Sequence, residues 1–367
     1  MTNLIVATRV IDPDDPTFGF LVPQLECLAK RVAHLSVVAD EVRRVPRSLN
    51  AEVISLGTES GVGKFRRGLR YVDIVRDLVR RQRPHALIAH GRPVYLDLVA
   101  PLIRAYGVAP LLWYVHESQG APLRIAEHLA EAVLTAIPES YPGPSEKVRV
   151  TGHAIDTHRF VRTPSPPRSN GVQLLSMGPT SPDKRYPDLL AGVAKARRRG
   201  VDARLRIVGS STDDGEIEHR RELLALVNSL SLAGAVSLEL GRPSSEVPKL
   251  MSQAHAIVSG QASAGKAVFE AMACGRPVLT PRQSSAGLSS GTALELEFDV
   301  GDAEGLADRI CSLAFAFGDE LEAVGSELRS RVEKEHSLEH WADRVVAVSE
   351  ELGGRNLFGL WGREALR

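Results

Sequence analysis

The chain has 367 residues, of which 43% are hydrophobic and 25% are charged, a composition typical of a globular protein in water. Basic and acidic residues number 45 each, so the overall charge does not favour nucleic acid as a partner. The three cysteines lie far apart without CxxC spacing, which argues against a disulfide framework or a zinc site, and the length predicts two domains.

The opening stretch, "MTNLIVATRVIDPDD", contains a short apolar run with no basic residues before it. This pattern favours a first β-strand over a signal peptide. Further along the sequence, no apolar run approaches the length needed to span a bilayer. We therefore expect a cytoplasmic protein.

The first half of the chain alternates strand-like and helix-like segments. After the strand "LIVATRV", apolar residues fall at helical spacing from Leu21 to Val32, and "LSVVA" and "AEVISLG" are typical of strands. The stretch "HALIAHG", a helix over about 95–106 and the stretch "LLWYVH" continue the alternation. Continuous apolar strands separated by amphipathic helices predict a parallel sheet covered on both faces.

A long helix is predicted from about Lys64 to Arg83. Its apolar residues are expected to face inward: Phe65, Leu69, Val72, Val75 and Val79. The same helix gathers many basic residues, with Asp73 and Asp77 between them. A solvated face is the ordinary interpretation, and the alternative is a basic patch for peripheral contact of helix 64–83 with anionic lipid at the inner face of a membrane, or with a phosphorylated acceptor.

The second half repeats the alternation after a break. Residues 162–171, "RTPSPPRSNG", are rich in proline, serine and glycine, which predicts a linker. The strands "VQLLSMG", "ARLRIVGS", "AVSLEL", "HAIVSG" and "PVLTP" then alternate with helices. We predict two doubly wound, Rossmann-like α/β domains that face each other across a cleft. The expected ranges are 1–161, the linker 162–171, 172–340, and a C-terminal helix and tail over 341–367 that packs back toward the first domain.

Small and charged residues cluster after the first strand of the second domain. In "LLSMGPTSPDK", Gly178 lets the backbone approach a ligand, Thr180 can donate a hydrogen bond, and Lys184 can bind a phosphate. A solvated lysine near a helix start is the plain alternative. The stretch "LRIVGSS" places Gly209 at another strand end.

The stretch "ASAGKAVFEAMACGRPVL" combines a small-residue loop with two charges on a helix. Gly265 leaves room for a diphosphate to reach the helix N-terminus, where unpaired N–H groups favour an anion. Lys266 adds a cation, and Glu270 shares its face at i,i+4 spacing. The carboxylate can accept hydrogen bonds from two ribose hydroxyls. A surface Lys–Glu pair is the alternative, which the small apolar surroundings disfavour.

These stretches resemble one family. "KAVFEAMACGRPVL" resembles part of the donor-binding signature of retaining GT-B glycosyltransferases, in particular the family 4 group, glycosyl transferases group 1. "GPTSPDK" is similar to that family's phosphate-contacting loop, and "DDPTFGFLVPQLECLAKRV", "LLWYVHES" and "VRVTGHAIDTHRF" resemble segments of its acceptor domain. The likeness runs through nearly the whole chain in the expected order.

The resemblance implies a role for individual residues. Glu270 corresponds to the glutamate on the nucleotide ribose and Lys184 to the lysine on the diphosphate, whereas His116 corresponds to the histidine beside the reacting centre. These three form the predicted catalytic set, although a histidine at a strand end is often only structural. The predicted donor-binding set comprises Gly19, Gly178, Thr180, Lys184, Gly209, Arg242, Gly265, Lys266, Ala267, Val268 and Glu270.

Two positions depart from the family pattern. Pro179 stands where the family commonly has an arginine, and Ala262 where it commonly has a glutamate that contacts the donor sugar. Lys266 is placed to supply the missing positive charge, and nothing evident replaces the carboxylate. The sugar is therefore expected to be held differently, or to be a different sugar.

The predicted activity is a retaining, hexosyl-type transfer from a nucleoside-diphosphate sugar, first a UDP-sugar, to a hydroxyl of a glycan, glycolipid or small natural product. No cofactor and no metal are expected, although the carboxylates of "DPDD", Asp12 to Asp15, leave a metal-binding interpretation open beside that of a turn. A sugar-nucleotide epimerase and a catalytically lapsed binding protein are the alternative functions. Neither the donor sugar nor the acceptor is fixed by the residues.

Overall fold

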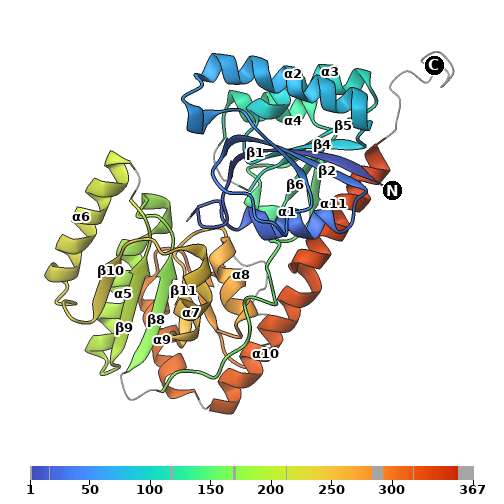
Figure 1. Ribbon diagram of the computed structural model, residues 1–367. Helices are drawn as coiled ribbons and strands as arrows, with labels where there is room; N and C mark the ends of the chain where they lie inside the picture. Colours follow the sequence, from blue (N-terminus) through green and yellow to red (C-terminus); the bar gives the residue numbers. More distant parts are fainter. Residues whose placement is uncertain are drawn as a thin grey trace. The chain divides into compact units, whose positions relative to one another are not determined.

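The computed structural model describes residues 2–15, 17–115, 119–167, 171–211, 213–282, 292–316 and 318–353. The chain divides into two compact units, one of Met1–Ala154 with Leu338–Arg367 and one of Ile155–Ser337. Each unit contains one parallel sheet, with helices between its strands (Figure 1). The α/β class with two doubly wound units is confirmed.

The first unit alternates strands and helices along the chain. Its strands are β1 (Asn3–Ile11), β2 (His34–Val42), β3 (Glu52–Ser55), β4 (Ala86–His90), β5 (Ala109–Trp113), β6 (Ala132–Thr135) and β7 (Val148–Val150). Its helices are α1 (Leu21–Ala29), α2 (Lys64–Gln82), α3 (Val94–Ala105), α4 (Ala121–Leu129) and α11 (Leu338–Leu352).

The first sheet has the order β3-β2-β1-β4-β5-β6-β7, and all of its pairings are parallel. Because side chains alternate along a strand, Leu4 and Val6 face one hydrophobic cluster, whereas Ile5 and Ala7 face another. Helices α1 and α11 cover the first of these faces, and α2, α3 and α4 cover the second (Figure 1). Both faces of the sheet are therefore buried, which is why the strands are continuously apolar.

Helix α2 corrects one expectation. Its buried residues are Tyr71, Val75, Leu78 and Val79, whereas Phe65 and Leu69, expected to face inward, are exposed to 80% and 55%. At about 100° per residue, Leu69 lies roughly 160° around the helix from Tyr71, so the two cannot share one buried stripe. The buried face of α2 begins at Tyr71, and the first turns of the helix leave apolar side chains on the surface.

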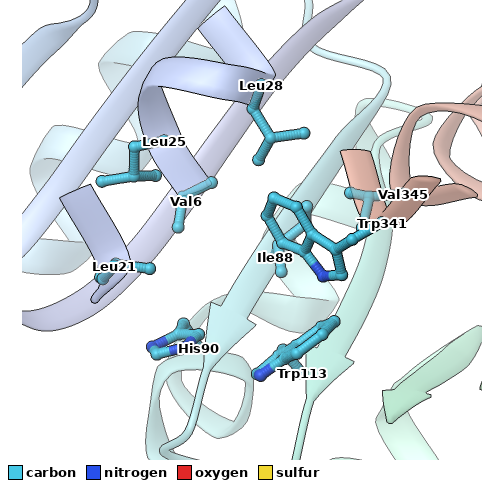
Figure 2. Close-up of a pocket in the computed structure, with 9 residues that line it drawn as sticks. All are labelled: Val6, Leu21, Leu25, Leu28, Ile88, His90, Trp113, Trp341 and Val345. Atoms are coloured by element: carbon cyan, nitrogen blue, oxygen red, sulfur yellow. The ribbon is translucent and has the colours of Figure 1, made fainter. Parts of the chain in front are cut away.

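A small cavity lies inside the first unit. It is lined by side chains from β1, β4, β5, α1 and α11, among them His90, Trp113 and Trp341 (Figure 2). The two tryptophan rings meet edge to face with centroids 5.5 Å apart. With a volume of about 10 Å³, the cavity has room for about one water molecule, so it belongs to the core and not to a sugar site.

The second unit repeats the alternation with different lengths. Its strands are β8 (Val172–Met177), β9 (Ala203–Val208), β10 (Val236–Glu239), β11 (Ala256–Val258), β12 (Val278–Pro281) and β13 (Glu297–Phe298). Its helices are α5 (Tyr186–Arg198), α6 (Asp214–Ser229), α7 (Val247–Ser252), α8 (Lys266–Ala273), α9 (Ala303–Phe315) and α10 (Gly318–Glu335).

The second sheet is also parallel, with the order β10-β9-β8-β11-β12-β13. The strand order therefore reverses between β8 and β11. Open parallel sheets bind ligands at the carboxyl ends of their strands where the order reverses. The topology therefore predicts a ligand site in the loops that follow β8 and β11.

The unit boundaries fall earlier than the expected 161 and 340. Ile155 donates its N–H to the carbonyl of His336 and pairs with Ser337, which joins both ends of the second unit to each other. The buried guanidinium of Arg276 donates to the hydroxyls of Thr163 and Ser165 at 2.6 and 3.2 Å. The described start of the expected linker is therefore held against the second unit.

Across the described ranges, no helix combines the length and apolar character that spanning a bilayer requires.

Candidate functional site

The candidate site lies at the carboxyl ends of β8 and β11. The loop after β8 contains Gly178, Thr180 and Lys184, and the loop after β11 leads into α8 at Lys266. These two loops follow the neighbouring strands between which the strand order reverses, which is the topological switch point of the sheet.

Gly178 and Gly209 bring two strand ends into direct contact. Gly178 has φ +146°, and a Cβ there would lie 2.8 Å from Cε of Lys184. A Cβ on Gly209 would lie 1.7 Å from the carbonyl oxygen of Gly178, a distance that no side chain tolerates. Gly209 is therefore required for the contact between the strand ends, and Gly178 leaves the space that the lysine side chain occupies.

Lys184 is held by the loop after β11. Its Nζ donates to Oε1 of Gln261 at 2.8 Å, and Nε2 of Gln261 donates to Oδ2 of Asp183 at 3.0 Å. Nζ of Lys184 lies 3.9 Å from that same carboxylate oxygen. The lysine side chain is 19% exposed, with the amide oxygen of Gln261 and the carboxylate of Asp183 as its neighbours.

Thr180 is fully buried, and its hydroxyl forms hydrogen bonds within the protein. The hydroxyl lies 2.6 Å from the hydroxyl of Ser211 and donates to the carbonyl of Glu216 at 2.9 Å. The backbone N–H of Thr180 donates to the carbonyl of Ser210. These bonds tie the loops after β8 and β9 together.

Helix α8 carries the paired charges that the sequence indicated. Gly265 is its N-cap, Lys266 and Glu270 are half-buried, and Val268 is 2% exposed. Ala267 is half-buried between them. The helix therefore presents one lysine and one glutamate from a mostly apolar surface.

Burial perturbs both charged groups of α8. Desolvation lowers the pKa of Lys266 to about 8, opposed by the Glu270 carboxylate and reinforced by Arg159. Desolvation raises the pKa of Glu270, opposed by Lys266 and Arg159. Charges withdrawn from water in this way gain from a polar, charged ligand, and perturbed groups of this kind are typical of binding sites.

Arg159 was not among the residues that the sequence selected. Its Nη2 donates to Oγ of Ser244 at 3.0 Å and to the carbonyl of the same residue, and Asp156 accepts a hydrogen bond from its backbone N–H. The expected range 1–161 places this segment at the end of the first domain, whereas Ile155 onward belongs to the second unit. A charged residue in the quoted stretch "IDTHRF" was the available signal.

Arg242 lies on the surface of the same unit. Its side chain is 46% exposed, and its Nη2 lies 3.3 Å from Oε2 of Glu239. Glu239 also pairs with Arg206, and the hydrogen bonds from Arg206 lower the pKa of Glu239 to about 2. Arg242 is therefore part of a surface ion-pair network, and contact with a nucleotide base stays a prediction.

Two further predicted residues fall in the sequence range of the first unit. The buried Gly19 donates its N–H to the carbonyl of Asp15 at 2.9 Å and belongs to the loop after β1. His116 lies outside the described residues, so its catalytic role stays a prediction.

The carboxylates of "DPDD" are engaged within the protein. Asp15 accepts hydrogen bonds from the backbone N–H groups of Thr17 and Phe18 and pairs with Arg43 at 2.9 Å. Asp14 pairs with Arg44. The described residues contain no group of three or more potential metal-ligating side chains, and the pairings favour a turn.

Comparison with known proteins agrees with this fold. Residues 171–314, which contain the candidate site, match the family model "Glycosyl transferases group 1". No curated protein matches the chain in sequence.

Several solved structures share the fold over nearly the whole chain. The Anabaena Alr3699/HepE structure in complex with UDP and glucose has a TM-score of 0.74 and 15% identity, over 95% of this chain and 100% of that one. Sucrose-phosphate synthase from Thermosynechococcus elongatus gives 0.75 and 17%, over 95% and 99%. The lipopolysaccharide outer core galactosyltransferase WaaB gives 0.66 and 14%, over 95% and 100%.

Proposed function

We propose that this chain is a glycosyltransferase that moves a sugar from a nucleoside-diphosphate sugar to an acceptor hydroxyl, with retention at the anomeric carbon. One observation carries the proposal. The half-buried Lys266 and Glu270 of α8 follow β11, and Lys184 lies over the end of β8 beside it. The family match over 171–314 and the shared fold support the same function.

The donor is held by complementary charges. Lys184, Lys266 and the N-terminal N–H groups of α8 supply positive potential to a diphosphate, and the carboxylate of Glu270 accepts hydrogen bonds from ribose hydroxyls. Burial strengthens these interactions because little water competes for the charges. Complexes of Anabaena Alr3699/HepE with UDP and with UDP-glucose make UDP-sugars the first donors to test.

The same charges promote the reaction. As the bond between the sugar and the diphosphate breaks, negative charge gathers on the leaving phosphate, where the two lysines stabilise it without reorganisation. The acceptor attacks from the face that the diphosphate leaves, and its proton passes to the departing phosphate. In this proposal the lysines take the place of a divalent metal, and His116 acts beside the reacting centre.

The decisive experiment mixes the full chain with UDP-, GDP- and dTDP-sugars and a set of hydroxyl acceptors, and follows release of the nucleoside diphosphate. We expect acceptor-dependent release with one nucleotide class, unchanged by a chelator, and NMR of the product showing retained anomeric configuration. Epimerised donor without transfer would indicate a sugar-nucleotide epimerase. Tight nucleotide binding without turnover would indicate a lapsed enzyme, as the departures at Pro179 and Ala262 allow.

We also propose that the first unit touches an anionic lipid surface. Phe65 and Leu69 are exposed beside Lys64 and Arg66, and Leu98 of α3 packs over Gly68, so the apolar surface continues onto a second helix. Apolar side chains among cations are the composition that inserts into an anionic bilayer surface.

In this proposal the lipid-contacting surface is the start of α2. Arg76 pairs with Asp73 and Arg81 with Asp77, so the second half of the helix is largely neutralised. No carboxylate pairs with Lys64 or Arg66 within the part of the chain that the structure describes. The N-terminal turns therefore carry the net positive charge.

Vesicle sedimentation tests the lipid contact. The wild-type chain should sediment with phosphatidylglycerol vesicles and not with phosphatidylcholine, and the double variant F65S/L69S should lose most of this binding. The variant F315S removes an equally exposed phenylalanine from the second unit and serves as the control. Equal losses in the two variants would contradict the assignment.

A further inference from the structure

We propose that Gln261 is a positioning residue that holds Lys184 at the donor diphosphate. The proposal rests on the proposed function and deepens it. Gln261 immediately precedes Ala262, the position at which the carboxylate expected from the family resemblance is missing. Neither the family match nor the sequence pattern points to this glutamine.

The hydrogen bonds of the glutamine fix its orientation. A lysine ammonium can only donate and a carboxylate can only accept, so the amide oxygen must face Lys184 and the amide nitrogen must face Asp183. A glutamine satisfies both neighbours at once. A glutamate would place a second carboxylate beside Asp183, and an apolar residue would satisfy neither.

The bridge connects the two loops of the switch point. Lys184 follows β8, whereas Gln261 follows β11, and a Cβ built on Gly260 would lie 3.0 Å from the carbonyl oxygen of Lys184. Oε1 of Gln261 also lies 3.4 Å from the position of a Cβ on Gly265, the N-cap of α8. The lysine is thereby directed toward the start of the helix that carries Lys266.

Asp183 completes the cluster around the lysine. Its Oδ2 pairs with Nζ of Lys184 at 3.9 Å and accepts a hydrogen bond from Nε2 of Gln261 at 3.0 Å. The glutamine therefore contacts both charged groups and fixes where the ammonium lies.

Calorimetric titration with UDP, GDP and uridine tests the proposal on the full chain. In the variant Gln261→Met, which removes both hydrogen bonds at similar volume, we expect about tenfold weaker UDP binding and less than twofold change for uridine. The selective loss for the diphosphate is a readout that a general structural defect would not produce. Gln253→Met is the matched control, because Gln253 accepts from Arg206 on the surface of the same unit.

A double-mutant cycle shows whether Gln261 acts through the lysine. In a Lys184→Met background, Gln261→Met should change UDP affinity less than twofold. If Gln261→Met does not fold, as judged from its thermal unfolding, Gln261→Asn, whose amide is too short to bridge, replaces it. Additive losses, or equal losses for UDP and uridine, would overturn the positioning role. A wild-type chain that binds neither UDP nor GDP would overturn the proposed function, and this proposal with it.

Discussion

The switch points of the two sheets share one topology and differ in chemistry. In the first unit, the ends of β1 and β4 bring Thr8 and His90 within 3.2 Å of each other, with the ring of Trp113 stacked near His90. In the second unit, the ends of β8 and β11 bring together Lys184 and Gln261. Buried aromatic and hydroxyl groups thus pack in the core at one switch point, and a lysine lies at the other.

Strand order therefore locates a site but does not determine its ligand. Open parallel sheets bind ligands where the strand order reverses. Lysines and a helix N-terminus favour a diphosphate, whereas the buried groups at the first switch point indicate no class of ligand. Donor chemistry can therefore be inferred from the second unit, and the acceptor cannot be inferred from the first.

The largest expected effect comes from adding a side chain where two strand ends of the second unit touch. In Gly209→Ala, the new Cβ meets the carbonyl oxygen of Gly178, so backbone must move, at a cost of about 3 kcal/mol or more of unfolding free energy. Denaturant unfolding measures this cost, and UDP binding should be lost as well. Gly318→Ala is the control, since a Cβ there meets nothing within 4 Å. Equal stability of the two variants would mean that the strand ends are not in contact.

The next effect tests the ribose contact. Glu270→Gln removes the charged acceptor, and with two charge-assisted hydrogen bonds at stake UDP affinity should fall about 100-fold. Titration calorimetry provides the measurement, with Glu218→Gln on the exposed surface of α6 as the control. An unchanged affinity in a folded sample would remove the main support for a nucleotide site.

The effect of pH on UDP affinity should be smaller than the effect of Glu270→Gln. It should depend on the protonation of Lys266. Its pKa falls from the usual 10.5 to about 8, so between these values the unfolded chain holds more protons, and the contribution of this group to stability rises with pH. Diphosphate binding requires the protonated form, so affinity runs the opposite way and should fall as pH rises above about 8.

Calorimetry at pH 7 and pH 9 detects this fall, which should be about tenfold or less for a single group. In Lys266→Met the affinity should be lower at pH 7 and nearly the same at both pH values. A variant that keeps the full pH dependence would place the titrating group elsewhere.

The smallest expected effect on UDP affinity comes from two matched threonine variants, one at each switch point. Thr8 and Thr180 are both fully buried threonines near the carboxyl end of the first strand of their sheets. Thr180→Val should weaken UDP binding several-fold by loosening the loops after β8 and β9, whereas Thr8→Val should leave it within twofold. Each loses about 1 kcal/mol of stability with its hydrogen bonds. A larger loss of UDP affinity in Thr8→Val than in Thr180→Val would contradict the assignment of the nucleotide to the second unit.

Local patterns predicted the strands, their parallel pairing and the charges of α8. These features depend on residues close together in sequence, such as Lys266 and Glu270 on one helix. The inward direction of Phe65 and Leu69 was wrong because packing against the sheet begins at Tyr71, which periodicity alone does not reveal.

Contacts between distant segments could not be predicted. Arg159 influences Lys266 and Glu270 only because the segment after Ile155 folds with the second unit. Gln261 meets Lys184 across 77 positions of sequence. Its significance depends on the neighbouring strand, and no spacing rule connects the two.

The pairing of Ile155 with Ser337 has a consequence for how the chain can be divided. Because the second unit is one continuous segment whose termini adjoin, it has the topology of an inserted domain within an interrupted host. Excision at these two points removes residues 155–337 without cutting any strand of the host sheet. The excised piece retains Lys184, Gln261, Lys266 and Glu270, so nucleotide recognition should survive excision.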